Sequence, residues 1–174
     1  ITVSALPVSR DDAHAFGVMK VLKSGRIREF VEKPTDAAVL DSLITPDKVF
    51  EDFGLNGAGK PYLASMGVYV FKAEVLEKLL MEHVEWVDFG RELIPHSLGT
   101  HQVYAHMFSG FWEVIGTVRS YFDVGMAMTT DDAPFKLNGL KDPIYTHARC
   151  LPGVQISDAH IKNVIICEGS RVTK

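Results

Sequence analysis

The sequence has few of the residue patterns that would assign a chemistry directly. Its 174 residues contain two cysteines, Cys150 and Cys167, which lie 17 positions apart and form no CxxC pair. We expect them to be reduced, buried thiols that behave as small hydrophobic side chains. None of the seven histidines is placed in an HxxxH or HxH pattern, which argues against a zinc site. The sequence also contains no GxSxG string, so it shows no sign of a Ser-His-Asp hydrolase.

Charge and hydropathy exclude two classes of partner. The net charge is −4 and the lysines and arginines are scattered, whereas a nucleic-acid-binding protein needs a clustered basic face. No apolar run reaches the roughly 18 residues that span a bilayer, so we expect no membrane partner. The hydrophobic fraction of 47% is high enough for a packed core. We therefore expect one folded domain, or one domain and part of a second.

The chain also lacks a glycine-rich phosphate-binding loop. An enzyme that transfers a nucleotidyl group needs such a loop, or an equivalent cluster of backbone N–H groups. The chain opens on Ile1, without Met, in sequence that already resembles a strand. We interpret it as a piece of a longer protein, in which any such loop and the catalytic residues would have to lie upstream of Ile1.

The first sixty residues predict strands and one short helix. Residues 1–8 read as a strand, and residues 16–22 and 26–31 as a hairpin around the turn at 23–25. A short helix is expected over 46–53, with Thr45 as N-cap and Pro46 in its first turn. We expect the rest of the polar stretch 35–60 to be a surface excursion.

The next seventy residues mix strands and helices. Residues 62–71 read as a strand, and Gly67 in its middle indicates close approach of another backbone or a ligand. Helices are expected over 74–83, over 88–94 with Asp88 as cap and Pro95 as terminator, and over 117–128. Residues 103–108 form a further expected strand. This mixture of hairpins and crossovers predicts an α/β fold with a mixed sheet.

The character of the sequence changes near Pro134, and helix signals stop from Ile144 onward. Apolar residues then recur every five or six positions, at Ile156, Ile161, Ile166 and Val172. This spacing fits the opening of a hexapeptide-type parallel β-helix, although an ordinary pair of strands would look similar. We therefore expect two domains, residues 1–140 and residues 141–174.

Four residues are candidates for ligand binding. Lys33 follows a strand and precedes a proline, where a fixed ammonium can hold a phosphate. The carboxylate of Glu32 can accept hydrogen bonds from sugar hydroxyls. Ser65 offers a small hydroxyl on a strand, and Gly17 would let a ligand approach the backbone. Taken alone, each residue also has an ordinary structural explanation.

Six strings in order resemble one enzyme family. They are FGVM at 16–19, FVEKP at 30–34, YLASMGVYVF at 62–71, DFGRELIP at 88–95, WEVIGT at 112–117 and PIYT at 143–146. In this order and spacing they closely resemble glucose-1-phosphate adenylyltransferase, also called ADP-glucose pyrophosphorylase. The resemblance implies the C-terminal part of a Rossmann-like nucleotidyltransferase domain with a mixed sheet, followed by the start of a left-handed parallel β-helix.

The resemblance also implies an activity and a set of ligands. The expected reaction converts ATP and glucose 1-phosphate into ADP-glucose and pyrophosphate, for glycogen or starch synthesis. By its matching positions, Gly17, Glu32, Lys33 and Ser65 would bind the sugar phosphate. Mg²⁺ is the expected cofactor of the full-length enzyme. A homotetramer in the bacterial cytoplasm, or in a plastid if the source is a plant or alga, is the expected assembly and location.

Val114 departs from the pattern of that family. It stands in WEVIGT, where the family has a metal-binding aspartate, and valine offers no oxygen ligand to a hard cation. Three interpretations stay open: a variant of a working ADP-glucose pyrophosphorylase, a non-catalytic or regulatory subunit that binds sugar phosphate, or a sister pyrophosphorylase for another nucleotide or sugar. We expect the 174-residue piece alone to be inactive.

Overall fold

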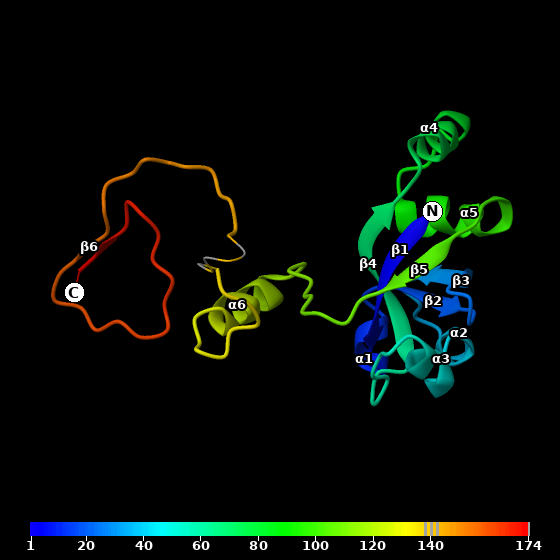
Figure 1. The fold of residues 1–174 in the computed structure, drawn as a ribbon, viewed down its shortest axis with the longest axis horizontal. Coiled ribbons are helices and arrows are strands. Elements are labelled where there is room, and N and C mark those ends of the chain that lie inside the picture. The colour runs from blue at the N-terminus through cyan, green and yellow to red at the C-terminus, as the bar shows by residue number, and fades with distance from the viewer. Residues whose placement is uncertain (138, 140, 142, 174) are drawn as a thin grey trace. The chain divides into compact units, whose positions relative to one another are not determined.

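The computed structural model describes residues 1–137, 139, 141 and 143–173. The chain forms two compact units, Ile1–Ser109 and Gly110–Lys174, which are described separately below (Figure 1). The expected domain boundary at residue 140 falls on a position outside the described residues, and the division into residues 1–140 and 141–174 stays a prediction.

The first unit is built on a five-stranded sheet. Its strands are β1 (Thr2–Val8), β2 (Gly17–Val21), β3 (Ile27–Glu32), β4 (Tyr62–Val70) and β5 (Tyr104–Met107). They are ordered β3-β2-β4-β1-β5, and only β1 and β5 run parallel. The β2–β3 hairpin turns at Gly25, whose φ of +81° is open to glycine without strain. The structure therefore confirms the α/β fold with a mixed sheet.

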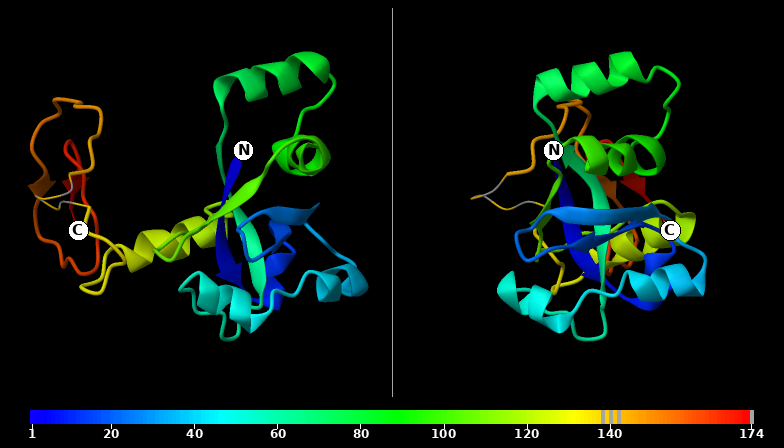
Figure 2. Two further views of the ribbon diagram at one scale, coloured as in Figure 1. Left: turned by 45° about the vertical axis from the view of Figure 1, so that its right-hand side comes forward. Right: turned by 90° about the vertical axis from the view of Figure 1, so that its right-hand side faces the viewer.

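Both faces of this sheet are covered. Alternate strand residues point to opposite faces, so Met19 and Leu63 join one buried cluster while Val18 and Ala64 join the other. The first cluster receives side chains from α3 (Asp47–Asp52), α4 (Ala73–Glu82) and α5 (Ile94–Thr100). The second receives them from α1 (Arg10–Ala13) and α2 (Ala37–Ser42). Figure 2 shows these helices around the sheet from two further directions.

The stretch 35–60 is not a surface excursion, contrary to the sequence prediction. It contains α2, where the Asp36 side chain accepts hydrogen bonds from the N–H groups of Ala38 and Val39. Leu40 is fully buried, so α2 belongs to the core. The short helix α3 confirms the helix expected over 46–53, but its N-cap is Pro46 and not Thr45. The hydroxyl of Thr45 is instead buried, with no hydrogen-bond partner among the described residues.

Pro95 does not end the helical segment that begins at Asp88. A π-helical turn, η1 (Phe89–Leu93), runs directly into α5, and Pro95 lies in the first turn of α5. Proline is tolerated there because the first N–H groups of a helix have no partner inside the helix. The expected helix over 88–94 is thus the beginning of a longer helical segment.

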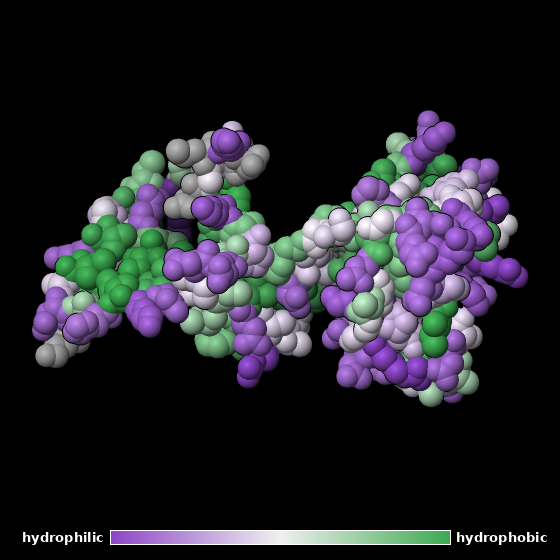
Figure 3. All heavy atoms as spheres, turned by 60° about the horizontal axis from the view of Figure 1, so that its bottom comes forward, coloured by the Kyte–Doolittle hydropathy of each residue, from purple (hydrophilic) through white to green (hydrophobic). Residues whose placement is uncertain are grey.

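The second unit buries little of its surface. It contains α6 (Val118–Ala127), which confirms the expected helix and begins with a capping box between Thr117 and Ser120. None of its described residues is buried, and many of its apolar side chains are exposed (Figure 3). Both cysteines are exposed, so the prediction of buried thiols is wrong. Across all described residues, no helix has the length and apolar character needed to cross a membrane.

Among its described residues, the C-terminal part of this unit has one pair of short strands. These are β6 (Gln155–Ile156) and β7 (Arg171–Val172), which pair in parallel with Gln155 opposite Arg171. Parallel pairing of successive passes of the chain is what a β-helix requires. A single pair of two-residue strands does not establish one, and the left-handed β-helix stays a prediction.

Candidate functional site

The sequence candidates of the first unit lie on one face of the sheet. Gly17 begins β2 and is the register partner of Glu32, the last residue of β3. Because side chains alternate, Glu32 shares the face of Phe30, and Ser65 shares the face of Leu63. This is the face of the first buried cluster, on which η1 and α5 pack.

The carboxylate of Glu32 occupies space that two glycines leave open. A Cβ atom on Gly17 would lie 2.7 Å from Glu32 Oε2, and a Cβ on Gly90 would lie 2.5 Å from the same oxygen. Gly90 belongs to η1, which is far from β3 in the sequence. The Glu32 side chain is only 17% exposed as a result. Any residue with a side chain at position 90 would displace this carboxylate.

Lys33 places an ammonium group beside that carboxylate. Its Nζ lies 3.7 Å from Glu32 Oε1, and its side chain is 54% exposed. The Lys33 backbone has a φ of +48°, in the left-handed region that residues other than glycine rarely adopt. Its N–H donates to the carbonyl of Phe16 at 2.9 Å, which ties it to the residue before β2. The backbone of Lys33 is thus fixed by a hydrogen bond, while its ammonium group is exposed enough to contact a ligand.

Ser65 lies where β4 bulges away from β1. Between the pairs Ala5–Ser65 and Val3–Tyr69, β4 advances four residues while β1 advances two. Gly67 adopts a φ of +70° in this bulge and donates its N–H to Ser65 Oγ at 3.2 Å. No atom outside its neighbours lies within 4 Å of a Cβ placed on Gly67. The glycine suits the positive φ of the bulge and no other backbone approaches it, so the close approach of a ligand at Gly67 stays a prediction.

Tyr69 joins these residues, although the sequence analysis did not select it. Burial raises the pKa of its phenol above the ordinary value of 10, a hydrogen bond with Ser65 acts in the opposite direction, and the charges of Glu32 and Asp88 raise it further. Its ring stacks on Phe89 with centroids 5.7 Å apart. The bulge therefore brings a second hydroxyl to the face that carries Glu32.

Asp88 fixes the turn that carries Gly90. Its Oδ1 accepts the N–H groups of Gly90 at 2.8 Å and Arg91 at 2.9 Å, as the predicted cap requires. Glu92 Oε2 in turn accepts the N–H groups of Val87 at 2.7 Å and Asp88 at 2.9 Å. The position of Gly90 against Glu32 is therefore held by a closed set of hydrogen bonds.

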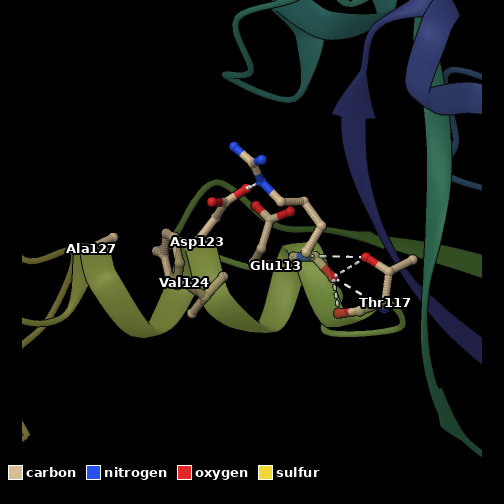
Figure 4. Close-up of a pocket in the computed structure, with 8 residues that line it drawn as sticks. Glu113, Thr117, Asp123, Val124 and Ala127 are labelled. Carbon is tan, nitrogen blue, oxygen red and sulfur yellow. Dashed lines mark hydrogen bonds and ion pairs between the residues drawn. The ribbon is translucent and has the colours of Figure 1, made fainter.

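The second unit contains Val114 and a small pocket (Figure 4). The pocket has a volume of about 410 Å³ and is lined by Phe111, Glu113, Thr117, Arg119, Ser120, Asp123, Val124 and Ala127. Arg119 Nε donates to Asp123 Oδ2 at 2.7 Å, and this bond raises the pKa of the guanidinium. Val114 lies outside the pocket lining and is 39% exposed.

Val114 stands where the family resemblance leads one to expect a metal-binding aspartate. A magnesium ion needs oxygen ligands, and Val114 has none to offer. Among the described residues, no group of three acidic, histidine or cysteine side chains could hold a metal ion. The described residues thus do not by themselves fit Mg²⁺, no chemical step is assigned to it, and Mg²⁺ as cofactor of the full-length enzyme stays a prediction.

The first unit offers groups suited to a polyhydroxylated anion. Glu32 is an acceptor for hydroxyl groups, Ser65 and Tyr69 can both donate and accept, and Lys33 supplies positive charge. The four residues thus combine hydrogen-bonding groups with one positive charge. Residues 1–131, which include every residue of this site, match the nucleotidyl transferase family. The match covers most of the 174 residues, and the chain therefore belongs to the nucleotidyl transferase family.

Proposed function

We propose that the site binds the sugar phosphate substrate of a sugar-nucleotide pyrophosphorylase, and that this substrate is glucose 1-phosphate. The observation that carries the proposal is the Glu32 carboxylate enclosed by Gly17 and Gly90, with the Lys33 ammonium 3.7 Å away. An acceptor and a cation held side by side match a sugar hydroxyl next to a phosphate. Membership of the nucleotidyl transferase family supports the reaction class.

Each residue has a defined part in this proposal. Lys33 Nζ holds phosphate oxygens, Glu32 accepts hydrogen bonds from hydroxyls of the sugar, and Ser65 and Tyr69 bond further hydroxyls. The bound phosphate oxygen then attacks the α-phosphorus of ATP. The new P–O bond forms as the bond to the β-phosphate breaks, and pyrophosphate leaves with the electron pair. The residues of this chain bind and orient the nucleophile.

Ligand titration of the chain tests the binding half of the proposal. We expect saturable binding of glucose 1-phosphate by calorimetry, with glucose and inorganic phosphate each binding more weakly. Lys33→Gln and Glu32→Gln should each weaken the affinity at least about tenfold, because each removes a charged hydrogen-bonding partner. Lys23→Gln, at the exposed turn of the same hairpin, is the matched control and should bind normally. Wild-type affinity in Lys33→Gln would remove the basis of the proposal.

Val114 favours a second candidate, a sugar-phosphate-binding subunit without catalytic activity. Loss of a metal-binding carboxylate weakens catalysis by several kcal/mol of transition-state stabilisation, whereas binding through Lys33 can persist. Pyrophosphate release by the complete protein, measured with ATP and with other nucleoside triphosphates, separates the candidates. A large increase in turnover in Val114→Asp, but not in Val118→Asp, supports a lost catalytic aspartate. Efficient turnover by the wild type with another triphosphate supports a sister pyrophosphorylase.

A further inference from the structure

His14 contacts the segment that presents Lys33. The helix α1 ends at Ala13, and the His14 ring that follows places Nδ1 2.6 Å from the carbonyl oxygen of Pro34. A carbonyl oxygen only accepts hydrogen bonds, so Nδ1 carries the proton and donates it. The bond is partly buried, and Pro34 itself is buried. The neutral Nδ1–H tautomer and the imidazolium both make this bond.

The backbone of Lys33 is held from both sides by one short segment. Before its Cα, the Lys33 N–H donates to the carbonyl of Phe16 at 2.9 Å. After it, the carbonyl of the following residue, Pro34, accepts from His14. Between these anchors Lys33 keeps a φ of +48°, which an unconstrained lysine would leave for a negative value. Such a conformation persists only where the surroundings impose it.

The direction of the Lys33 side chain depends on this backbone conformation. A change of φ from positive to negative rotates the Cα–Cβ bond relative to β3 and moves the ammonium away from its place beside Glu32. We propose that His14 is a positioning residue that, by its bond to Pro34, holds Lys33 in the left-handed conformation in which its ammonium meets the phosphate of the substrate. The inference rests on the proposed function and extends it to a residue that touches no ligand.

A double-mutant cycle tests this role. His14→Ala should weaken binding of glucose 1-phosphate about three- to tenfold, as expected for one lost hydrogen bond, and leave the affinity for glucose unchanged. His14→Asn keeps a donor close to the position of Nδ1 and should restore most of the affinity. In a Lys33→Gln background, His14→Ala should change the Kd by less than about twofold, because the residues act through each other. His106→Ala, an exposed histidine of β5, is the control.

Backbone amide exchange gives a readout that needs no ligand. His14→Ala should speed exchange of the Lys33 N–H, and His14→Asn should restore its protection. Unchanged exchange in His14→Ala would overturn the inference, as would an equal loss of affinity in the wild-type and Lys33→Gln backgrounds. If the wild type bound no glucose 1-phosphate, the proposed function would fall. Exchange of the Lys33 amide would still decide whether His14 holds this backbone.

Discussion

Gly90→Ala separates the stability of the fold from the function of Glu32. The new Cβ would lie 2.5 Å from Glu32 Oε2 and 2.9 Å from Glu32 Cδ, so the carboxylate has to move. A carboxylate at the end of a flexible side chain moves easily, and alanine is favoured over glycine inside a helix by about 1 kcal/mol. The free energy of unfolding should therefore change by no more than about 1 kcal/mol.

Binding should respond far more strongly than stability. Losing a hydrogen bond to a charged group costs about 1.5–3 kcal/mol, which weakens the affinity about 10- to 150-fold. Calorimetric titration with glucose 1-phosphate and denaturant unfolding measure the two quantities on the same sample. We expect a large loss of affinity in a protein that unfolds at nearly the same denaturant concentration.

Substitutions of two further glycines are controls for this experiment. A Cβ on Gly99 in α5 meets no atom within 4 Å, so Gly99→Ala should bind normally. A Cβ on Gly17 would clash with the buried ring of Phe30 as well as with Glu32, so Gly17→Ala should also destabilise the fold by about 1–3 kcal/mol. Normal affinity in a folded Gly90→Ala protein would refute the assignment of Glu32 as a ligand-binding residue.

Four further substitutions concern single residues of the first unit. Lys33→Gly should stabilise the fold by about 1 kcal/mol in denaturant unfolding, since glycine adopts a φ of +48° without strain, and should abolish phosphate-dependent binding. The pKa of Tyr69 lies above its ordinary value of 10, so its contribution to stability is complete below pH 10 and is lost as the pH rises through the raised pKa. Tyr69→Phe should accordingly flatten the fall of the melting temperature above pH 10, and an unchanged profile would contradict this cause. Thr45→Val removes a buried hydroxyl that has no partner among the described residues and should stabilise the fold by about 1 kcal/mol, whereas Ser97→Ala, which loses the buried bond to the Leu93 carbonyl, should destabilise it by a similar amount.

The strands were predictable because their signals are local. Alternating apolar residues and the turn at 23–25, which contains Ser24 and Gly25, were enough to predict the β2–β3 hairpin. The helix α2 was missed because six residues make less than two turns and show no clear period. Pro95 was misread because proline ends a helix from its interior, but not from its first turn.

The site was predictable only in part, for a similar reason. Glu32, Lys33 and Ser65 lie in strings that resemble a known family, so the sequence selected them without any geometry. Gly90 and Tyr69 matter through contacts with Glu32 and Ser65, and these contacts depend on the packing of η1 against β3 and on the bulge in β4. The signal for η1 was present in Asp88, which the sequence identified as a helix cap but not as the support of Gly90.

The place of β1 within the sheet sets the order in which the first unit matures during translation. β1 pairs with β4 on one side and with β5 on the other, although it precedes both in the sequence. When Thr2–Val8 leaves the ribosome, neither partner exists, and its second edge stays bare until Tyr104–Met107 has been made. An unpaired apolar strand can pair with other chains, so the nascent polypeptide is exposed to aggregation throughout this interval. A chain on a ribosome stalled before Met107 should therefore be cut readily by proteases. A chain on a ribosome stalled well after Met107 should resist them.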